Sequence, residues 1–143
     1  MNTPTILCML FTAFCWSCNT LAPMVNTTEA QFIFRGTVQE LYVANLPEIK
    51  DTQNTAIVKV DEVVYAPSDF ADWTGKSITV AFRSADSLKL EQRKLFFTSG
   101  WLYGKSLAVV EVEDGLDQEL TNEEIKASVQ KREDDKVRER LKQ

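Results

Sequence analysis

Histidine is absent from the 143-residue sequence. The imidazole side chain is the general base of Ser–His and Cys–His catalytic pairs, a common zinc ligand, and the group that moves protons near neutral pH. Those three kinds of chemistry are therefore excluded. This exclusion is the firmest functional statement that the composition supports.

Cysteine is confined to the start of the chain, at Cys8, Cys15 and Cys18, so disulfides within the folded part are excluded. Cys15 and Cys18 form a C-x-x-C pair. A thioredoxin-type pair needs a helix directly after it, and residues 19–23 are a poor helix start. A zinc site would need further ligands, and there is no histidine to supply one. We therefore expect neither a metal nor a cofactor.

Basic residues are missing ahead of the apolar run Ile6–Trp16. This run is too short to span a bilayer and has the length of the apolar part of a secretory signal. The alternative is an apolar segment that packs on the domain. We expect residues 1–18 to be a signal segment and residues 19–30 a linker. The protein would then be extracytoplasmic, either secreted or attached to a membrane at its N-terminus, with Cys18 as the processing or lipidation site.

Positive charge is also scarce overall, because the formal net charge is −5. Binding to a nucleic-acid backbone needs a basic surface, so we expect no nucleic-acid partner. The hydrophobic fraction of 44% is ordinary for a globular protein, and the length fits one domain.

The stretch from Gln31 to Val43 reads as a strand that changes phase. Phe32, Phe34, Gly36 and Val38 share one face, and the apolar set then moves by one residue to Leu41 and Val43. A bulge near residues 39–40, with Gly36 allowing a bend, would let both sets face one core. The stretch 55–65 repeats this pattern, with Val58 and Val60 in one phase and Val63 and Tyr65 in the other, on either side of Asp61–Glu62.

Two successive strands that change phase are typical of a sheet that curls into a small barrel. Three further strands are expected at 77–83, 94–98 and 107–113. Leu88 and Leu90 are expected to be inward anchors before the fourth strand, and Leu107, Val109 and Val112 to face inward in the fifth. Thr121 and Glu124 form a capping box that opens a helix to about Leu141. The predicted fold is mainly β: a five-stranded OB-like Greek-key barrel over residues 31–115, followed by a charged C-terminal helix over 116–143. The charge run 131–142 is interpreted as a solvated helix face.

Two pairs of acids, Asp61–Glu62 and Asp69/Asp72, are the candidates for catalysis. A glycosidase would hold two such groups across a cleft. Acids on bulges and loops are usually solvated, and nothing in their surroundings indicates a raised pKa. We expect the protein not to be an enzyme.

Aromatic side chains are the more interesting group. Phe96 and Phe97 face opposite sides of one strand, so both are buried only if that strand is covered on two faces. Four others fall in or beside loops: Phe70, Trp73, Trp101 and Tyr103. These side chains could bind a sugar or a peptide at the barrel rim. The alternative, which we favour, is that they close the ends of the barrel.

A series of five segments resembles bacterial extracytoplasmic OB-like modules: F-I-F-R-G-T-V (32–38), T-A-I-V-K-V-D-E-V (55–63), S-I-T-V (77–80), L-F-F-T-S-G-W-L-Y-G (95–104) and L-A-V-V-E-V (107–112). These are similar in topology to netrin-like modules and to the tissue inhibitors of metalloproteinases. The resemblance covers residues 31 to 113, and it implies that the following helix connects to a second module. In those inhibitors an N-terminal cysteine chelates the protease zinc, and only Cys18 could correspond to it.

These observations favour a non-catalytic, exported binding module with a protein or glycan partner at the barrel rim. The binding residues to test are Phe70, Trp73, Trp101 and Tyr103. The alternative is an inhibitor of an extracellular metalloprotease.

Overall fold

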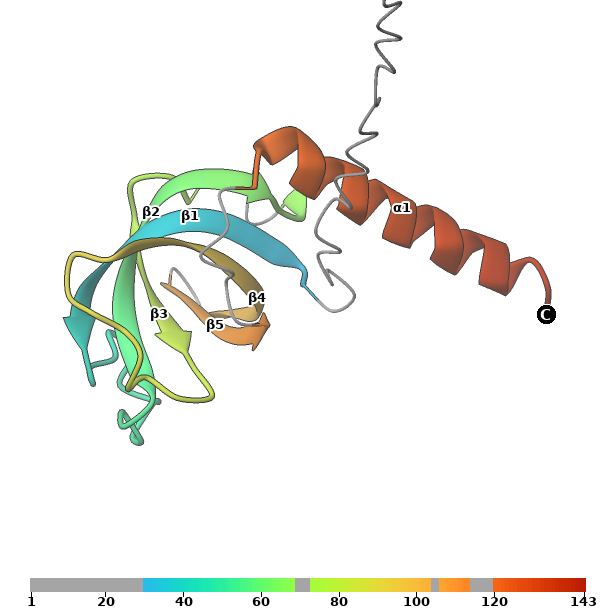
Figure 1. Cartoon of the computed structure of the whole chain (residues 1–143). Coiled ribbons are helices and arrows are strands. Elements are labelled where there is room, and N and C mark those ends of the chain that lie inside the picture. Colours follow the sequence, from blue (N-terminus) through green and yellow to red (C-terminus); the bar gives the residue numbers. More distant parts are fainter. Residues whose placement is uncertain (1–29, 69–72, 104–105, 114–119) are drawn as a thin grey trace, which may run out of the picture.

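The computed structural model describes residues 30–68, 73–103, 106–113 and 120–143, with the backbone alone for residues 101–103 and 113 (Figure 1). The strands are β1 (Phe32–Leu41), β2 (Thr55–Tyr65), β3 (Ser77–Ala81), β4 (Arg93–Tyr103) and β5 (Ser106–Glu113), followed by helix α1 (Asn122–Arg140). They close into a barrel in the order β1-β2-β3-β5-β4. Only the pair β3–β5 is parallel among the described pairs. The predicted five-stranded, mainly-β barrel with a C-terminal helix is confirmed.

Both predicted phase changes are β-bulges between β1 and β2. Val38 faces Val58 while Glu40 faces Ile57, so Gln39 is an extra residue in β1. On the other strand, Asp61 has no partner between the pairs that join Arg35 to Glu62 and Gly36 to Val60. Each bulge bends its strand and increases its twist. The bends let two long strands follow the wall of a narrow barrel.

A third bulge was not expected. Ile33 pairs with Tyr65 and Phe34 with Val63, which leaves Val64 as the extra residue. After this bulge the β2 side chains no longer face the barrel interior. Tyr65 therefore packs in the cluster outside the barrel, and its predicted place in the interior core was wrong.

Three other predicted inward residues lie elsewhere. Val43 is exposed, because β1 ends at Leu41 and Tyr42 adopts a left-handed backbone with φ of 59° that redirects the chain. Leu90 is 58% exposed, since it lies in a turn rather than a strand, although Leu88 is buried as expected. Val112 faces the outer cluster.

The barrel interior is filled by aromatic and branched side chains. Phe34 stacks between Phe32 and Phe96, with ring centroids 4.9 and 5.0 Å apart. Val38, Val58, Val60, Ile78, Val80, Phe82, Leu107 and Val109 complete most of this cluster. At Gly36 the strands β1 and β2 approach closely: an added Cβ would lie 2.7 Å from Val58 Cγ1 and 2.8 Å from the Lys59 carbonyl oxygen.

A second hydrophobic cluster lies outside the barrel, beneath α1. Ile33 of β1 and Phe97 of β4 point into it, whereas their neighbours Phe34 and Phe96 point into the barrel. β4 is thus covered on both faces, which is the condition under which both Phe96 and Phe97 can be buried. Leu120, Ile125 and Val129 cover this cluster from the helix side, and α1 then projects away from the barrel (Figure 1).

The start of α1 is fixed as the sequence predicted. Thr121 is the N-cap, its hydroxyl accepts from the Glu124 backbone N–H at 3.3 Å, and the Glu124 carboxylate accepts from the Thr121 N–H at 2.8 Å. The bond from the Thr121 backbone N–H, followed by one that the Thr121 hydroxyl donates to the same carboxylate at 3.0 Å, lowers the pKa of Glu124. Arg35 of β1 donates to Asn122 and to the Leu120 carbonyl, which ties the helix start to the barrel.

One ion pair is buried among the interior rings. Lys94 Nζ lies 3.1 Å from Glu111 Oε1, with side chains 11% and 4% exposed. The ammonium also lies 5.2 Å from the centre of the Phe96 ring. The barrel interior is therefore a packed core with a charged pair at its edge.

Substituting Gly36 tests the close approach of β1 and β2. In Gly36→Ala the Cβ would collide with a backbone oxygen that cannot move aside, so we expect a loss of about 1–3 kcal/mol in the free energy of unfolding, measured by urea denaturation. Gly75→Ala is the control: Gly75 has φ of 81° but no atom within 4 Å of an added Cβ, so it reports backbone strain alone. A loss at Gly36 no larger than at Gly75 would contradict the steric explanation.

Substituting Lys94 tests the buried pair. Lys94→Met leaves Glu111 without its ammonium partner, and we expect the free energy of unfolding to fall by about 3–5 kcal/mol. Adding Glu111→Gln should restore part of this loss, because it removes the buried negative charge that the ammonium of Lys94 had faced. Additive losses in the double variant, measured by the same urea denaturation, would rule out this coupling.

A candidate binding groove between the helix and the barrel

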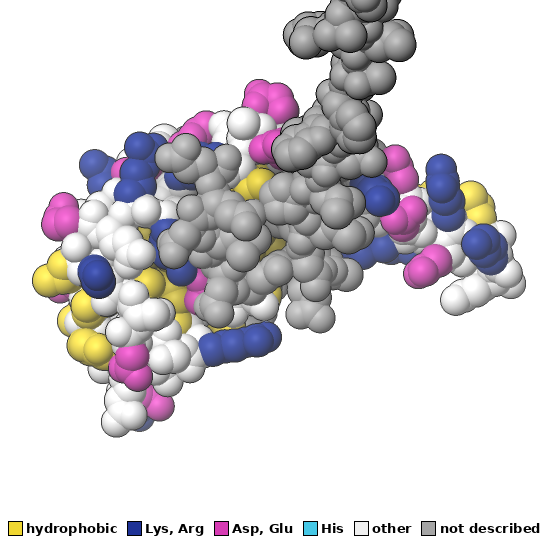
Figure 2. Space-filling model, viewed as in Figure 1, with side chains coloured by type: hydrophobic (Ala, Val, Ile, Leu, Met, Phe, Trp, Pro, Cys, Tyr) yellow, Lys and Arg dark blue, Asp and Glu magenta, His cyan; other side chains and the backbone are white. Residues whose placement is uncertain are grey.

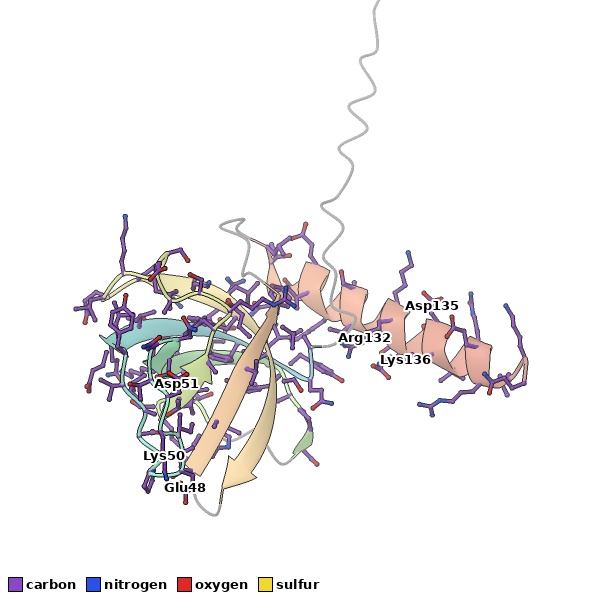
Figure 3. All side chains as sticks on the ribbon, turned by 90° about the horizontal axis from the view of Figure 1, so that it is seen from below. Glu48, Lys50, Asp51, Arg132, Asp135 and Lys136 are labelled. Carbon is purple, nitrogen blue, oxygen red and sulfur yellow. The ribbon has the colours of Figure 1, made fainter. Side chains whose placement is uncertain are left out.

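A groove of about 700 Å³ lies where α1 leaves the barrel wall. Its barrel side comes from the residues just before β1, the end of β2 and the segment after it, the middle of β4 and the end of β5. Its helix side comes from one face of α1. The lining residues are Ala30, Gln31, Tyr65, Pro67, Ser99, Val112, Arg132, Glu133 and Lys136. Arg132 and Lys136 lie one helical turn apart on α1 (Figure 3).

Arg132 fastens the helix to the barrel at the inner side of the groove. Its side chain is only 10% exposed, and Nη1 donates to the Ala30 carbonyl oxygen at 2.7 Å. The guanidinium carbon lies 5.8 Å from the centre of the Tyr65 ring, within the range of a cation–π contact. Arg132 thus joins α1 to Ala30, two residues before β1, and to Tyr65, the last residue of β2.

Glu133 neutralises part of the positive charge on the helix side of the groove. Its Oε1 lies 2.9 Å from Arg132 Nη2 and 3.5 Å from Lys136 Nζ. Desolvation alone would raise the pKa of Glu133, but the Arg132 hydrogen bond and the two nearby positive charges outweigh it and hold that pKa below its ordinary value. The three charged residues carry a net charge of +1, and Lys136 remains about half exposed.

The other lining residues offer apolar surface and hydrogen bonds. Tyr65 and Val112 are half-buried and pack against the outer hydrophobic cluster. Ser99 donates through its hydroxyl to the side-chain oxygen of Gln31 at 3.3 Å. This bond is long and solvent-exposed, so both groups can exchange partners at little cost. The groove can therefore combine apolar contact, a few hydrogen bonds and one accessible cation.

Of the four aromatic residues predicted to bind, the structure fully describes one. Trp73 is half-buried against the barrel core, and Lys76 Nζ lies 4.9 Å from its ring centre. Trp73 therefore packs against the interior core. The backbones of Trp101 and Tyr103 pair with Ala108 and Ser106 at the same end as the loop that holds Trp73. Their side chains, Phe70 and Cys18 lie outside the description.

The candidate acids are held by structural partners. Asp61 accepts from the Thr37 hydroxyl at 2.7 Å and lies 3.6 Å from Arg93 Nε. Glu62 lies 3.6 Å from Arg35 Nε and accepts from Asn122, at the start of α1. These contacts explain why acids occupy the bulge. Asp69 and Asp72 lie outside the described residues.

The residues of the helix side of the groove were not singled out in the sequence. The run 131–142 was interpreted as a solvated face; most of it is exposed, but this was wrong for Arg132. The sequence does contain a pattern that indicates the burial of Arg132. Ile125, Val129 and Arg132 follow the spacing i, i+4, i+7 and so share one helix face. Arginine extends such an apolar stripe because its stem packs while its head finds acceptors.

Removing the Glu133 charge tests this electrostatic arrangement. A depressed pKa in the folded state means that the carboxylate contributes stability above the unfolded-state pKa of about 4.3, and that this contribution disappears as the pH falls through the folded-state pKa. Glu133→Gln should therefore be less stable than the native protein at neutral pH, and the difference in urea midpoint should shrink below about pH 4.3. The control Glu139→Gln removes the same charge from an exposed part of α1 and should leave the urea midpoint at neutral pH close to that of the native protein. A Glu133→Gln difference that persists at about pH 3 would contradict the assignment.

No helix in the described part of the chain is long and apolar enough to cross a membrane. The described residues also contain no group of three or more Cys, Asp or Glu side chains placed to hold a metal ion. No protein-family model, curated protein or solved structure matches this chain.

Proposed function

We propose that this protein is a non-catalytic binding module and that the groove between α1 and the barrel takes an extended peptide segment with an acidic side chain. The observation that carries the proposal is the arrangement of charge in the groove. Glu133 engages both Arg132 and Lys136, so these groups are stabilised by each other rather than held ready for proton transfer. The half-exposed Lys136 remains available at the surface to pair with an acidic group.

A peptide fits the lining better than a glycan does. Sugar recognition relies on open aromatic faces, and one face of the Tyr65 ring lies against the Arg132 guanidinium. A peptide backbone offers donors and acceptors to Gln31 and Ser99, while its side chains contact Val112 and Pro67. Recognition of short extended segments by such mixed surfaces is common among interaction domains.

The proposal includes an extracytoplasmic location and attachment through the N-terminus at Cys18. It rests on the uncharged run Ile6–Trp16 and on the small residue Ser17 before that cysteine. The strand order β1-β2-β3-β5-β4 and the parallel pair β3–β5 support the OB-like resemblance, a fold that hosts many kinds of binding.

Selection from a displayed library of random linear peptides tests the groove. We expect peptides enriched on the native protein to contain Asp or Glu beside apolar residues. Their affinity should fall about tenfold or more, equivalent to 1.4 kcal/mol, for Lys136→Glu, because this change reverses the accessible charge. Binding is measured by isothermal titration calorimetry with the enriched peptides.

The matched control is Lys131→Glu, which makes the same charge change on an exposed position of α1 outside the groove lining. It should bind the enriched peptides as the native protein does. Equal losses in the two variants would indicate non-specific charge attraction. Failure to enrich any peptide would count against the groove as a peptide site.

A further inference from the structure

A second surface lies at the barrel end away from α1. The chain leaves β1 there and enters the loop that carries Glu48, Lys50 and Asp51 (Figure 3). Three of the five exposed large hydrophobic residues in the described part of the chain belong to this end: Tyr42, Val43 and Leu90. Figure 2 shows hydrophobic side chains gathered at the barrel end farthest from α1.

The edge of β1 is open at this end. Pairing with β4 stops at Thr37 and Arg93, followed by two hydrogen bonds that join Val38 to Glu91 and Gln92. β1 nevertheless continues to Leu41, paired with β2 alone. The Tyr42 N–H donates to the Thr55 carbonyl on the β2 side, and hydrogen-bonding direction alternates along a strand. The N–H and C=O of Leu41 are therefore directed to the open side.

The backbone is strained on both sides of this edge. Tyr42 has φ of 59° and Glu91 has φ of 61°, a conformation that bulky and charged side chains rarely adopt. Such strain is maintained only where the surrounding structure imposes it, and it is concentrated at functional sites. Here it holds Tyr42, Val43 and Leu90 in solvent, around an unpaired strand edge.

Charge indicates the kind of partner. Glu40 and Glu91 are exposed, and neither carboxylate has an ion-pair partner within the described residues. The basic residues flanking Glu91 are Lys89 and Arg93, and Arg93 is paired with Asp61 at 3.6 Å. Glu40 and Glu91 set against Lys89 leave this edge with a net charge of −1. An extended segment that alternates apolar and basic side chains would complement it.

The size of the surface favours a short segment over a second copy of the chain. Three side chains that are about half exposed present roughly 300 Å² of apolar surface. A stable pair of proteins usually buries about 800 Å² on each partner. We propose that the open edge of β1 accepts an extended apolar–basic peptide strand from a partner protein, which adds to the sheet beyond Val38.

The test uses a synthetic hexapeptide in which Val and Lys alternate. Hydrogen exchange measured by nuclear magnetic resonance should show that the Leu41 amide is protected at least fivefold when the peptide is added. The same peptide with alternate backbone nitrogens methylated should give no protection, because it cannot complete the ladder. Protection confined to the groove beside α1, or no binding at about 1 mM peptide, would overturn the proposal.

Charge reversal tests the complementarity. The double variant Glu40→Lys/Glu91→Lys should weaken binding at least tenfold, and Leu90→Ser at least threefold. Asp135→Lys, an exposed acid on α1, is the control and should bind as the native protein does. Equal affinity for the native protein and the double variant would overturn the proposal, as would self-association through this edge, detected as a dimer by analytical ultracentrifugation and abolished by the double variant.

Discussion

The pair of strands β1 and β4 has to be buried on both faces, and most of the remaining structure follows from this requirement. Phe34 and Phe96 fill the barrel, while Ile33 and Phe97 point outward from the same strands. A strand in a closed barrel has only one interior face, so the outward residues need a cover from elsewhere in the chain. Ile125 and Val129 of α1 supply it. The helix is thus part of the core.

The groove lies where it does because only the first half of α1 packs on the outer face of the barrel. Among the described residues of the helix only Ile125 and Val129 are buried, and the apolar Val137 lies in solvent beyond them. Arg132 makes the last firm contact, to Ala30 and Tyr65. Past that residue the straight helix and the curved barrel wall diverge. The groove opens at the point of divergence, which is why its helix side is charged and its barrel side partly apolar.

The features that the sequence predicted correctly are those that leave a pattern in neighbouring residues. The bulges at Gln39 and Asp61 each shift the alternation of apolar residues by one position. The start of the helix is indicated by the capping box that Thr121 and Glu124 form. The bulge at Val64 leaves no such mark, because Val63 and Val64 are both apolar. The exposure of Val43 follows from the left-handed backbone of Tyr42, a conformation that its residue type disfavours. The groove could not be predicted, because it depends on the angle between α1 and the barrel.

Because β1 and β4 are buried on both faces, the order in which the elements are synthesised affects how the protein folds. Ile33 and Phe97 leave the ribosome well before Ile125 and Val129 do. Until α1 has been synthesised, the nascent barrel exposes the hydrophobic side chains of its outer face. Chaperones recognise such surfaces, and they promote aggregation. Maturation of this protein therefore depends on an element that is synthesised after the barrel, and a translational pause within α1 would leave the outer hydrophobic cluster exposed.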